Sequence, residues 1–176
     1  PSGSGKRSPY VIAPTPGMTL RVTPSSGQFI RGVFSRPGVQ SGALFVVAGS
    51  TLYSISTSWT ATALGTILGS GRVLMDAIGA NLILLGSSNL YQWDGASLTQ
   101  ITDQDFPVSA YTLAALADRI LTSAQGADTF DWSAVGDALS WPATGFATSA
   151  RYPDELRAQI EIGGDLFHAG AASIQP

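Results

Sequence analysis

"GANLILLGSSNLYQWDGASLTQITDQDFP", residues 79–107, contains two short apolar runs that flank a polar turn, and a third run follows them. The runs are rich in Leu, Ile and Tyr and are bounded by Gly, Ser, Asn and Asp, which is the usual composition of β-strands. Asp94-Gly95 is a typical hairpin turn, because glycine adopts positive φ without a steric penalty. The stretch predicts an antiparallel zigzag whose apolar residues serve packing.

The same pattern recurs along the chain. "ALFVVAGSTLYSI" (43–55) aligns with "NLILLGSSNLYQW" (81–93), so that Leu44 matches Leu82, 38 residues further on. A looser copy at 118–133 places Ile120 at the same position, again 38 residues on, and a fourth at 164–175 places Leu166 there. A unit of about 40 residues with several short antiparallel strands is typical of a β-propeller blade.

We therefore expect an all-β fold built from propeller blades. Residues 1–17, rich in Pro, Gly and Ser, predict an extended lead-in. Residues 18–176 are predicted to form part of a β-propeller domain, about three blades and the start of another. Because a propeller needs more blades and a closure between the first and the last, we expect an incomplete propeller in this chain, which would then be a fragment or the ordered portion of something longer.

Composition narrows the classes of function. Only 12% of the 176 residues are charged, against about 25% in typical soluble domains, which favours a subunit that buries surface against partners. No run reaches the roughly 18 apolar residues of a spanning helix, so no membrane contact is expected. Cysteine is absent and there is one histidine, His168, which excludes thiolate metal sites and paired imidazole ligands.

Charge is distributed unevenly. Residues 1–75 contain six Lys or Arg and no acidic residue, whereas residues 76–176 contain all twelve acidic residues and three Arg. This is either compositional drift or the mark of a bipolar subunit whose basic and acidic parts meet different partners.

The motifs that resemble functional sites are incomplete. "SGSGKRS" (2–8) ends like a phosphate-binding loop, but Arg7 follows Lys6 and no strand precedes it, so we interpret it as a flexible basic arm. "GTILGSGR" (65–72) is a strand followed by a tight turn between blades. "DQDF" (103–106) offers two carboxylates without the further ligands that a calcium loop needs, and is expected to be a solvated turn.

Three further features point to packing. "SAVGDALSW" (133–141) differs from the sialidase Asp-box in the order and spacing of its Gly and Asp, and no tuned carboxylate pair can be assembled around it. His168 is interpreted as a packed or edge histidine, because no nucleophile or orienting acid is spaced to serve it. The four tryptophans favour blade packing, with sugar or base stacking as the alternative. We predict no catalytic, cofactor-binding or metal-binding residues, no cofactor and no enzymatic activity.

Longer segments resemble a known family. The segment Leu64–Met75, "LGTILGSGRVLM", and the signature "ITDQDFP" (101–107) are similar to those of the tail-hub, or packaged-DNA stabilisation, proteins of short-tailed bacteriophages. "ALSWPATGFATSARYPDEL" (138–156), "GDLFHAGAASIQP" (164–176) and the early "PTPG" (14–17) also resemble the family. Arg151 stands where the family tends to have Glu, and Phe167-His168 replaces a Trp-Leu-Phe run, which puts particular contacts in doubt but not the fold.

The resemblance implies a structural protein of the virion tail. It implies a homo-oligomeric ring, a hexamer, that joins the head–tail adaptor to the tail needle and retains packaged DNA, with the DNA nearby in the channel and no sequence-specific binding. The alternative is a carbohydrate- or receptor-binding propeller, with aromatic and carboxylate residues converging at one end of its axis. A second rival is a DNA-binding module that uses the basic amino-terminal part, against which an overall pI near 4.8 argues.

Overall fold

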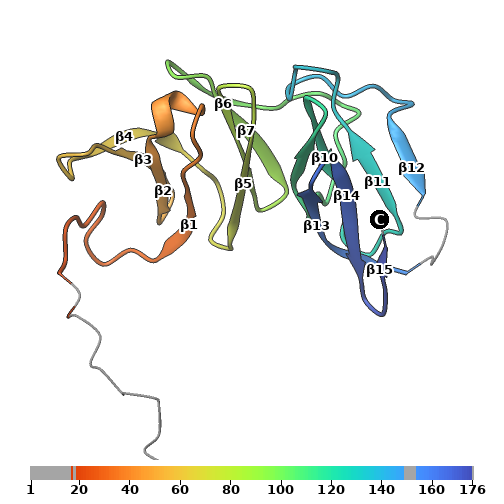
Figure 1. The fold of residues 1–176 in the computed structure, drawn as a ribbon, viewed down its shortest axis with the longest axis horizontal. Helices are drawn as coiled ribbons and strands as arrows, with labels where there is room; N and C mark the ends of the chain where they lie inside the picture. Colours follow the sequence, from red (N-terminus) through yellow and green to blue (C-terminus); the bar gives the residue numbers. More distant parts are fainter. Residues whose placement is uncertain (1–16, 18, 149–153, 176) are drawn as a thin grey trace, which may run out of the picture.

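The computed structural model describes residue 17, residues 19–148 and residues 154–175, and it shows a chain of short antiparallel strands (Figure 1). The predicted lead-in apart from Gly17, and with it the basic segment 2–8, lies outside the described residues. The strands are β1 (Ile30–Phe34), β2 (Leu44–Ala48), β3 (Thr51–Ile55), β4 (Ala61–Thr66), β5 (Val73–Ile78), β6 (Asn81–Gly86), β7 (Asn89–Trp93), β8 (Leu98–Gln100), β9 (Ala114–Leu116), β10 (Arg119–Thr122), β11 (Thr129–Trp132), β12 (Phe146–Thr148), β13 (Leu156–Ile162), β14 (Asp165–Gly170) and β15 (Ile174–Gln175). A short turn, η1 (Gln40–Gly42), follows β1.

Strands that are consecutive in sequence pair in four antiparallel sheets. Sheet 1 contains β1 to β4, sheet 2 contains β5 to β8, sheet 3 contains β9 to β12, and sheet 4 contains β13 to β15. The repeated leucine or isoleucine found in the sequence occupies the second strand of each sheet: Leu44 in β2, Leu82 in β6, Ile120 in β10 and Leu166 in β14. The repeat is therefore one sheet, and the repeated apolar run forms an inner strand, which has a partner on both sides.

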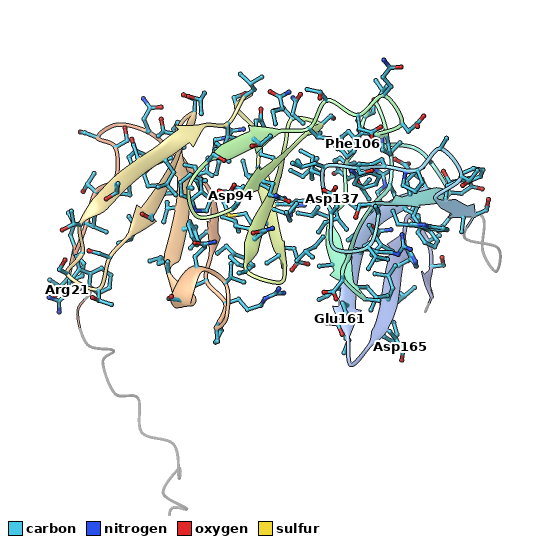
Figure 2. All side chains as sticks on the ribbon, turned by 90° about the horizontal axis from the view of Figure 1, so that it is seen from above. Arg21, Asp94, Phe106, Asp137, Glu161 and Asp165 are labelled. Atoms are coloured by element: carbon cyan, nitrogen blue, oxygen red, sulfur yellow. The ribbon has the colours of Figure 1, made fainter. Side chains whose placement is uncertain are left out.

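The sheets follow one another in an open array: sheet 1 lies on one side, sheet 2 beside it, and sheets 3 and 4 together on the other side (Figures 1 and 2). The first strand of each sheet lies beside the first strand of the next, from β1 to β5, β5 to β9 and β9 to β13. Such contact between innermost strands is the arrangement of propeller blades around an axis. The prediction of an all-β fold made of propeller blades is confirmed.

Strand β6 explains why the chain stacks in this way. Leu82 and Leu84 belong to the hydrophobic core between sheets 1 and 2, whereas Ile83 and Leu85 belong to the core between sheets 2 and 3. Successive side chains of a strand point to opposite faces, so a continuous apolar run needs a cover on both faces. All four residues are at most 3% exposed, and burying such a side chain contributes about 1.5–3 kcal/mol.

Short turns set the register of the hairpins. Several of them connect their strands by two residues, as where Gly86 pairs with Asn89 across Ser87-Ser88. The predicted turn at Asp94-Gly95 is confirmed: Gly95 has φ +102°, and Asp94 Oδ1 accepts hydrogen bonds from the backbone N–H groups of Ala96 and Ser97, both at 2.7 Å. These bonds lower the pKa of Asp94 and close the β7–β8 hairpin.

A buried arginine joins sheets 1 and 2. Arg31 of β1 is 7% exposed, and its guanidinium donates hydrogen bonds only to backbone carbonyls in the described chain. The acceptors are the carbonyl oxygens of Gly71 (from Nε, 2.6 Å), Gly49 (from Nη1, 2.9 Å), Ile67 (from Nη1, 3.1 Å) and Leu68 (from Nη2, 3.0 Å). Burial lowers the pKa of Arg31, but an arginine side chain stays charged in proteins. Arg31 thereby fixes the whole connection from β4 to β5.

The close approach of β1 to β5 also requires a glycine. A Cβ atom built on Gly32 would lie 2.6 Å from the carbonyl oxygen of Val73 and 2.9 Å from the terminal carbon of Met75. The first contact is with backbone and cannot be relieved by a rotamer change, so sheets 1 and 2 meet at this distance only with glycine at position 32.

We expect Arg31→Met to lower the free energy of unfolding by about 2–4 kcal/mol, because four carbonyls lose a donor in a buried place. Arg31→Lys keeps the charge but cannot present the planar fork, so its loss should be smaller but still measurable. Urea unfolding followed by tryptophan fluorescence measures both. Equal stability of the Met variant and the unsubstituted protein would contradict this role for Arg31.

Candidate functional site

The first strands of all four sheets surround a concavity of about 390 Å³. It lies where a propeller has its axis, which is a common place for ligand sites in such folds. The residues that line it belong to β1, β5, β9 and β13 or are close to them in sequence: Phe34, Arg36, Met75, Asp76, Leu113, Ala114, Ala115, Gln159, Ile160 and Glu161. Its ionisable groups are Arg36, Asp76 and Glu161.

Asp76 of β5 connects three sheets at this concavity. Its Oδ1 accepts a hydrogen bond from Arg36 Nη1 at 3.0 Å, and its Oδ2 accepts one from the backbone N–H of Ala115 in β9 at 2.8 Å. Arg36 also donates to the carbonyl oxygen of Ala77 at 2.9 Å. Both carboxylate oxygens are therefore occupied by structural donors, and Asp76 acts as a clamp between neighbouring first strands.

A second polar cluster joins sheets 3 and 4, centred on Gln159 of β13. Its Oε1 accepts a hydrogen bond from Thr112 Oγ1 at 2.8 Å, and its Nε2 donates to Ser123 Oγ at 3.1 Å. Gln159 Nε2 also lies 3.2 Å from His168 Nδ1 of β14. All four residues are at most 9% exposed, and every buried side-chain nitrogen and oxygen atom of the described residues has a hydrogen-bond partner. A satisfied network of this kind orients the two sheets.

The prediction that His168 is a packed histidine is confirmed. It is 5% exposed, contacts Gln159 and lies with its ring 4.6 Å from that of Phe130 in β11. In a neutral ring, Nδ1 can accept the hydrogen bond from Gln159 Nε2. In a protonated ring, Nδ1 would carry a proton and two donors, Nδ1–H and the Gln159 amide, would face each other. Burial accordingly lowers the pKa of His168.

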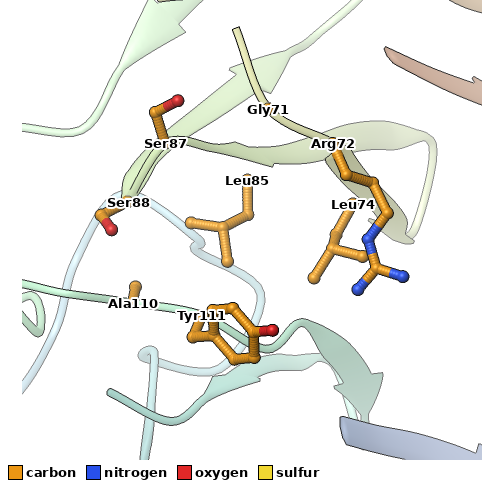
Figure 3. A pocket seen from close by; sticks show the side chains of 8 residues that line it. All are labelled: Gly71, Arg72, Leu74, Leu85, Ser87, Ser88, Ala110 and Tyr111. Atoms are coloured by element: carbon orange, nitrogen blue, oxygen red, sulfur yellow. The ribbon is translucent and has the colours of Figure 1, made fainter. Parts of the chain in front are cut away.

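A second hollow, of about 360 Å³, lies between sheets 2 and 3 (Figure 3). Leu74, Leu85 and Ala110 form its apolar part, with Arg72 and Tyr111 at its rim. Ser87 and Ser88 of the β6–β7 hairpin complete it. In Figure 3 the Arg72 guanidinium and the serine hydroxyls lie at different sides of the hollow, so they do not converge on one point.

The signature "ITDQDFP" has a structural role at the junction of sheets 2 and 3. Asp103 Oδ2 accepts a hydrogen bond from the backbone N–H of Trp141 at 2.9 Å, and Phe106 meets the Trp141 ring edge-on, with centroids 4.9 Å apart. The backbone donors Trp141 and Asp105 lower the pKa of Asp103. Asp103 is thus more than the solvated turn that the sequence predicted: it holds the long β11–β12 connection, 133–145, against the core.

The remaining motifs are also placed. Residues 65–72 form the end of β4 and a tight connection to β5, as predicted. Trp93 and Trp141 are buried and Trp132 is half-buried, in agreement with packing, whereas Trp59 is 47% exposed. Sequence reasoning missed Arg31, Asp76 and Gln159. The available signal was a single polar side chain within an apolar strand, as in "IRGVF" and "VLMDAI".

The polar contacts of Asp76, Gln159 and Asp103 hold neighbouring parts of the fold together. Within the described residues no group of three or more His, Asp and Glu side chains could hold a metal ion, and no nucleophile is aligned with a general base. The described part of the chain has no helix with the length and apolar character needed to span a bilayer.

The sequence profile of the family described as "Bacteriophage P22 Gp10, beta-propeller", a phage stabilisation family, matches residues 6–176. The chain belongs to this phage family. It is therefore a phage structural protein with a β-propeller, and the resemblance seen in the sequence is confirmed. No curated protein matches the chain.

Several solved structures share the fold of this phage-family member. The chain is 13% identical to the β-propeller domain of Cps50 (Swd1) from Myceliophteria thermophila, with a TM-score of 0.62, and the match covers 84% of this chain and 52% of that one. The computationally designed Ika4 protein is 9% identical with a TM-score of 0.62, covering 90% and 97%. A streptogramin B lyase is 11% identical with a TM-score of 0.57, covering 84% and 49%. The chain thus spans about half of the first and third of these structures, and at such identities the likeness concerns the fold alone.

The His168 cluster makes the stability of this family member dependent on pH. Because the folded pKa lies below the ordinary 6.5, the unfolded chain binds the proton more readily. The stabilisation is complete above about pH 6.5 and is lost as the pH falls through the folded pKa. We expect the free energy of unfolding to decrease from about pH 7 to pH 5, and to decrease less in His168→Gln, which cannot be protonated.

Urea unfolding at each pH measures this difference. Asp131 provides an internal comparison. Burial raises its pKa, so its contribution to the free energy of unfolding changes with pH in the opposite direction, and this contribution is present in both the unsubstituted protein and His168→Gln. Parallel pH profiles for the two proteins would show that His168 does not titrate in this range.

Proposed function

We propose that this protein is a tail hub of the virion, which joins the head–tail adaptor to the tail needle and retains packaged DNA. The observation that carries the proposal is its membership of the phage stabilisation family over residues 6–176. Holding a genome under pressure requires a rigid scaffold with several contact surfaces, and linked contacts raise avidity without a catalytic group. The clamped sheets described above are suited to this role, and we propose a structural activity and no enzymatic one.

The proposed assembly is a homo-oligomeric ring, a hexamer, with head-to-tail contacts between different faces of neighbouring copies. Two acidic side chains, Glu161 and Asp165, lie at the tip of the β13–β14 hairpin of sheet 4, far from the basic Arg21 (Figure 2). All three side chains are exposed. The basic surface is smaller than the sequence predicted, because Arg31 is buried and Arg36 pairs with Asp76.

The hub function predicts that phage particles made without this protein fill with DNA and then lose it. DNA inside intact particles is protected from nuclease, so the number of nuclease-resistant genomes per head, counted by quantitative PCR after purification, should fall by most of its value. Supplying the protein in trans should restore it. Particles that lack the protein and keep their genomes would refute the retention role.

The ring predicts assembly that weakens with salt, because exposed charges more than about 10 Å apart are screened at 0.1 M ionic strength. Light scattering of the protein over a salt series should show the oligomer dissociating as ionic strength rises. Glu161→Lys with Asp165→Lys should weaken assembly at low salt and flatten this dependence. Assembly that is indifferent to both salt and these substitutions would exclude an electrostatic contact at sheet 4.

A further inference from the structure

Three residues other than glycine adopt a left-handed backbone conformation in the β1–β2 and β3–β4 connections of sheet 1. Seven residues other than glycine have positive φ in the described chain. Four of them are the two central residues of two-residue hairpins, Ser87-Ser88 and Ala117-Asp118, where the turn type demands positive φ. The other three are Gln40 (φ 44°) and Ser41 (φ 60°) in η1, and Trp59 (φ 63°) in the β3–β4 turn. Strained positions of this kind tend to cluster at functional sites.

The β3–β4 turn of sheet 1, which contains Trp59, is one residue longer than the equivalent β7–β8 turn of sheet 2. In sheet 2 four residues connect β7 to β8, between the paired Trp93 and Leu98, whereas in sheet 1 five residues connect β3 to β4, between the paired Ile55 and Ala61. Trp59 occupies the left-handed position of the longer turn, where glycine is the favoured residue. The chain keeps a bulky aromatic there at a cost in stability.

The surrounding turn is firmly built. The backbone N–H of Trp59 donates to the carbonyl oxygen of Ser56 at 2.9 Å, and Ser56 Oγ lies 2.8 Å from Ser58 Oγ and accepts from the N–H of Thr60 at 3.0 Å. The backbone position of Trp59 is therefore defined, while its side chain is 47% exposed and does not belong to either hydrophobic core.

Trp59 lines a cavity of about 500 Å³, and the other two strained residues line it as well. Leu44 and Ile55 provide apolar surface. Gln40 Nε2 donates to the carbonyl oxygen of Ala80 at 3.0 Å, which holds this wall of the cavity against sheet 2. The cavity is thus formed by the β1–β2 and β3–β4 connections of one blade.

The chemistry of this cavity is neutral and amphipathic. None of its lining residues is ionisable. Ser41 and Thr57 line the cavity and are exposed, so their hydroxyls are accessible to a ligand. An indole face that packs against apolar ring faces, beside accessible hydroxyls that bind hydroxyls, is suited to a sugar.

We infer that this cavity, the Trp59 pocket, binds an uncharged saccharide, with a sugar ring stacked on the indole and its hydroxyls hydrogen-bonded to Ser41 and Thr57. A charged ligand would find no counter-ion, which favours neutral sugars over uronic acids and phosphates. The inference is independent of the hub function, since a hub could lack this pocket and a saccharide-binding propeller could form no hub. It also differs from the binding site considered from the sequence alone, in which carboxylates accompany the aromatic residues.

The test uses the whole chain and three substitutions. Isothermal titration calorimetry with maltotriose, chitobiose and galactobiose, and with glucuronic acid as the charged comparator, should show saturable binding of at least one neutral sugar and weaker binding of the acid. Trp59→Gly should weaken that binding by about tenfold or more, as expected when an aromatic contact residue is removed. Trp59→Phe should keep part of the affinity.

Stability separates a lost contact from a lost fold. Because glycine suits the left-handed position, Trp59→Gly should unfold at a temperature equal to or above that of the unsubstituted protein. Tyr111→Ala, at an exposed aromatic in the hollow between sheets 2 and 3, is the matched control and should leave sugar binding unchanged.

Three results would overturn the inference: no neutral sugar binding, binding that survives Trp59→Gly, or equal binding of glucuronic acid. If no sugar binds but Trp59→Gly prevents incorporation of the protein into tails, the pocket receives a protein neighbour and the saccharide assignment is wrong.

Discussion

Two-sided burial of the second strand is the constraint on which this structure depends. In β6, Leu82 and Leu84 pack against sheet 1, while Ile83 and Leu85 pack against sheet 3. A single sheet cannot hide both of its faces, so each needs another sheet on either side, and the stack continues along the chain. The hydrophobic effect thus determines that sheets stack, but it is not directional and does not determine how they are oriented.

Orientation comes from polar contacts between sheets. Arg31 binds four carbonyls around the entry to sheet 2, Asp76 links β5 to both of its neighbours, and Gln159 joins sheets 3 and 4. Hydrogen bonds have defined lengths and angles, and a buried donor without an acceptor is costly, so each contact permits few relative positions of its two sheets. Rigidity of this kind suits a protein that bears load.

The sequence revealed the part of the structure that is periodic. The repeated apolar run places Leu44, Leu82 and Ile120 in equivalent strands because strand alternation and turn chemistry act over a few residues. The contacts between sheets could not be predicted in this way, since Arg31 and Gly71 or Thr112 and Gln159 lie 40 or more residues apart and their partners include backbone atoms. Trp59 was counted with the packing tryptophans because nothing in "STSWTAT" discloses that its φ is positive or that it is half exposed.

The contacts between sheets differ chemically from one boundary to the next. A guanidinium meets carbonyl oxygens at the first boundary, a carboxylate meets a backbone amide at the second, and an amide side chain meets hydroxyls and an imidazole at the third. The apolar run is shared by the sheets, whereas the polar contacts between them are not. The blades are consequently not interchangeable: an exchanged blade would lack the polar partners that its new neighbours require, so the order of the blades along the sequence is part of what determines the fold.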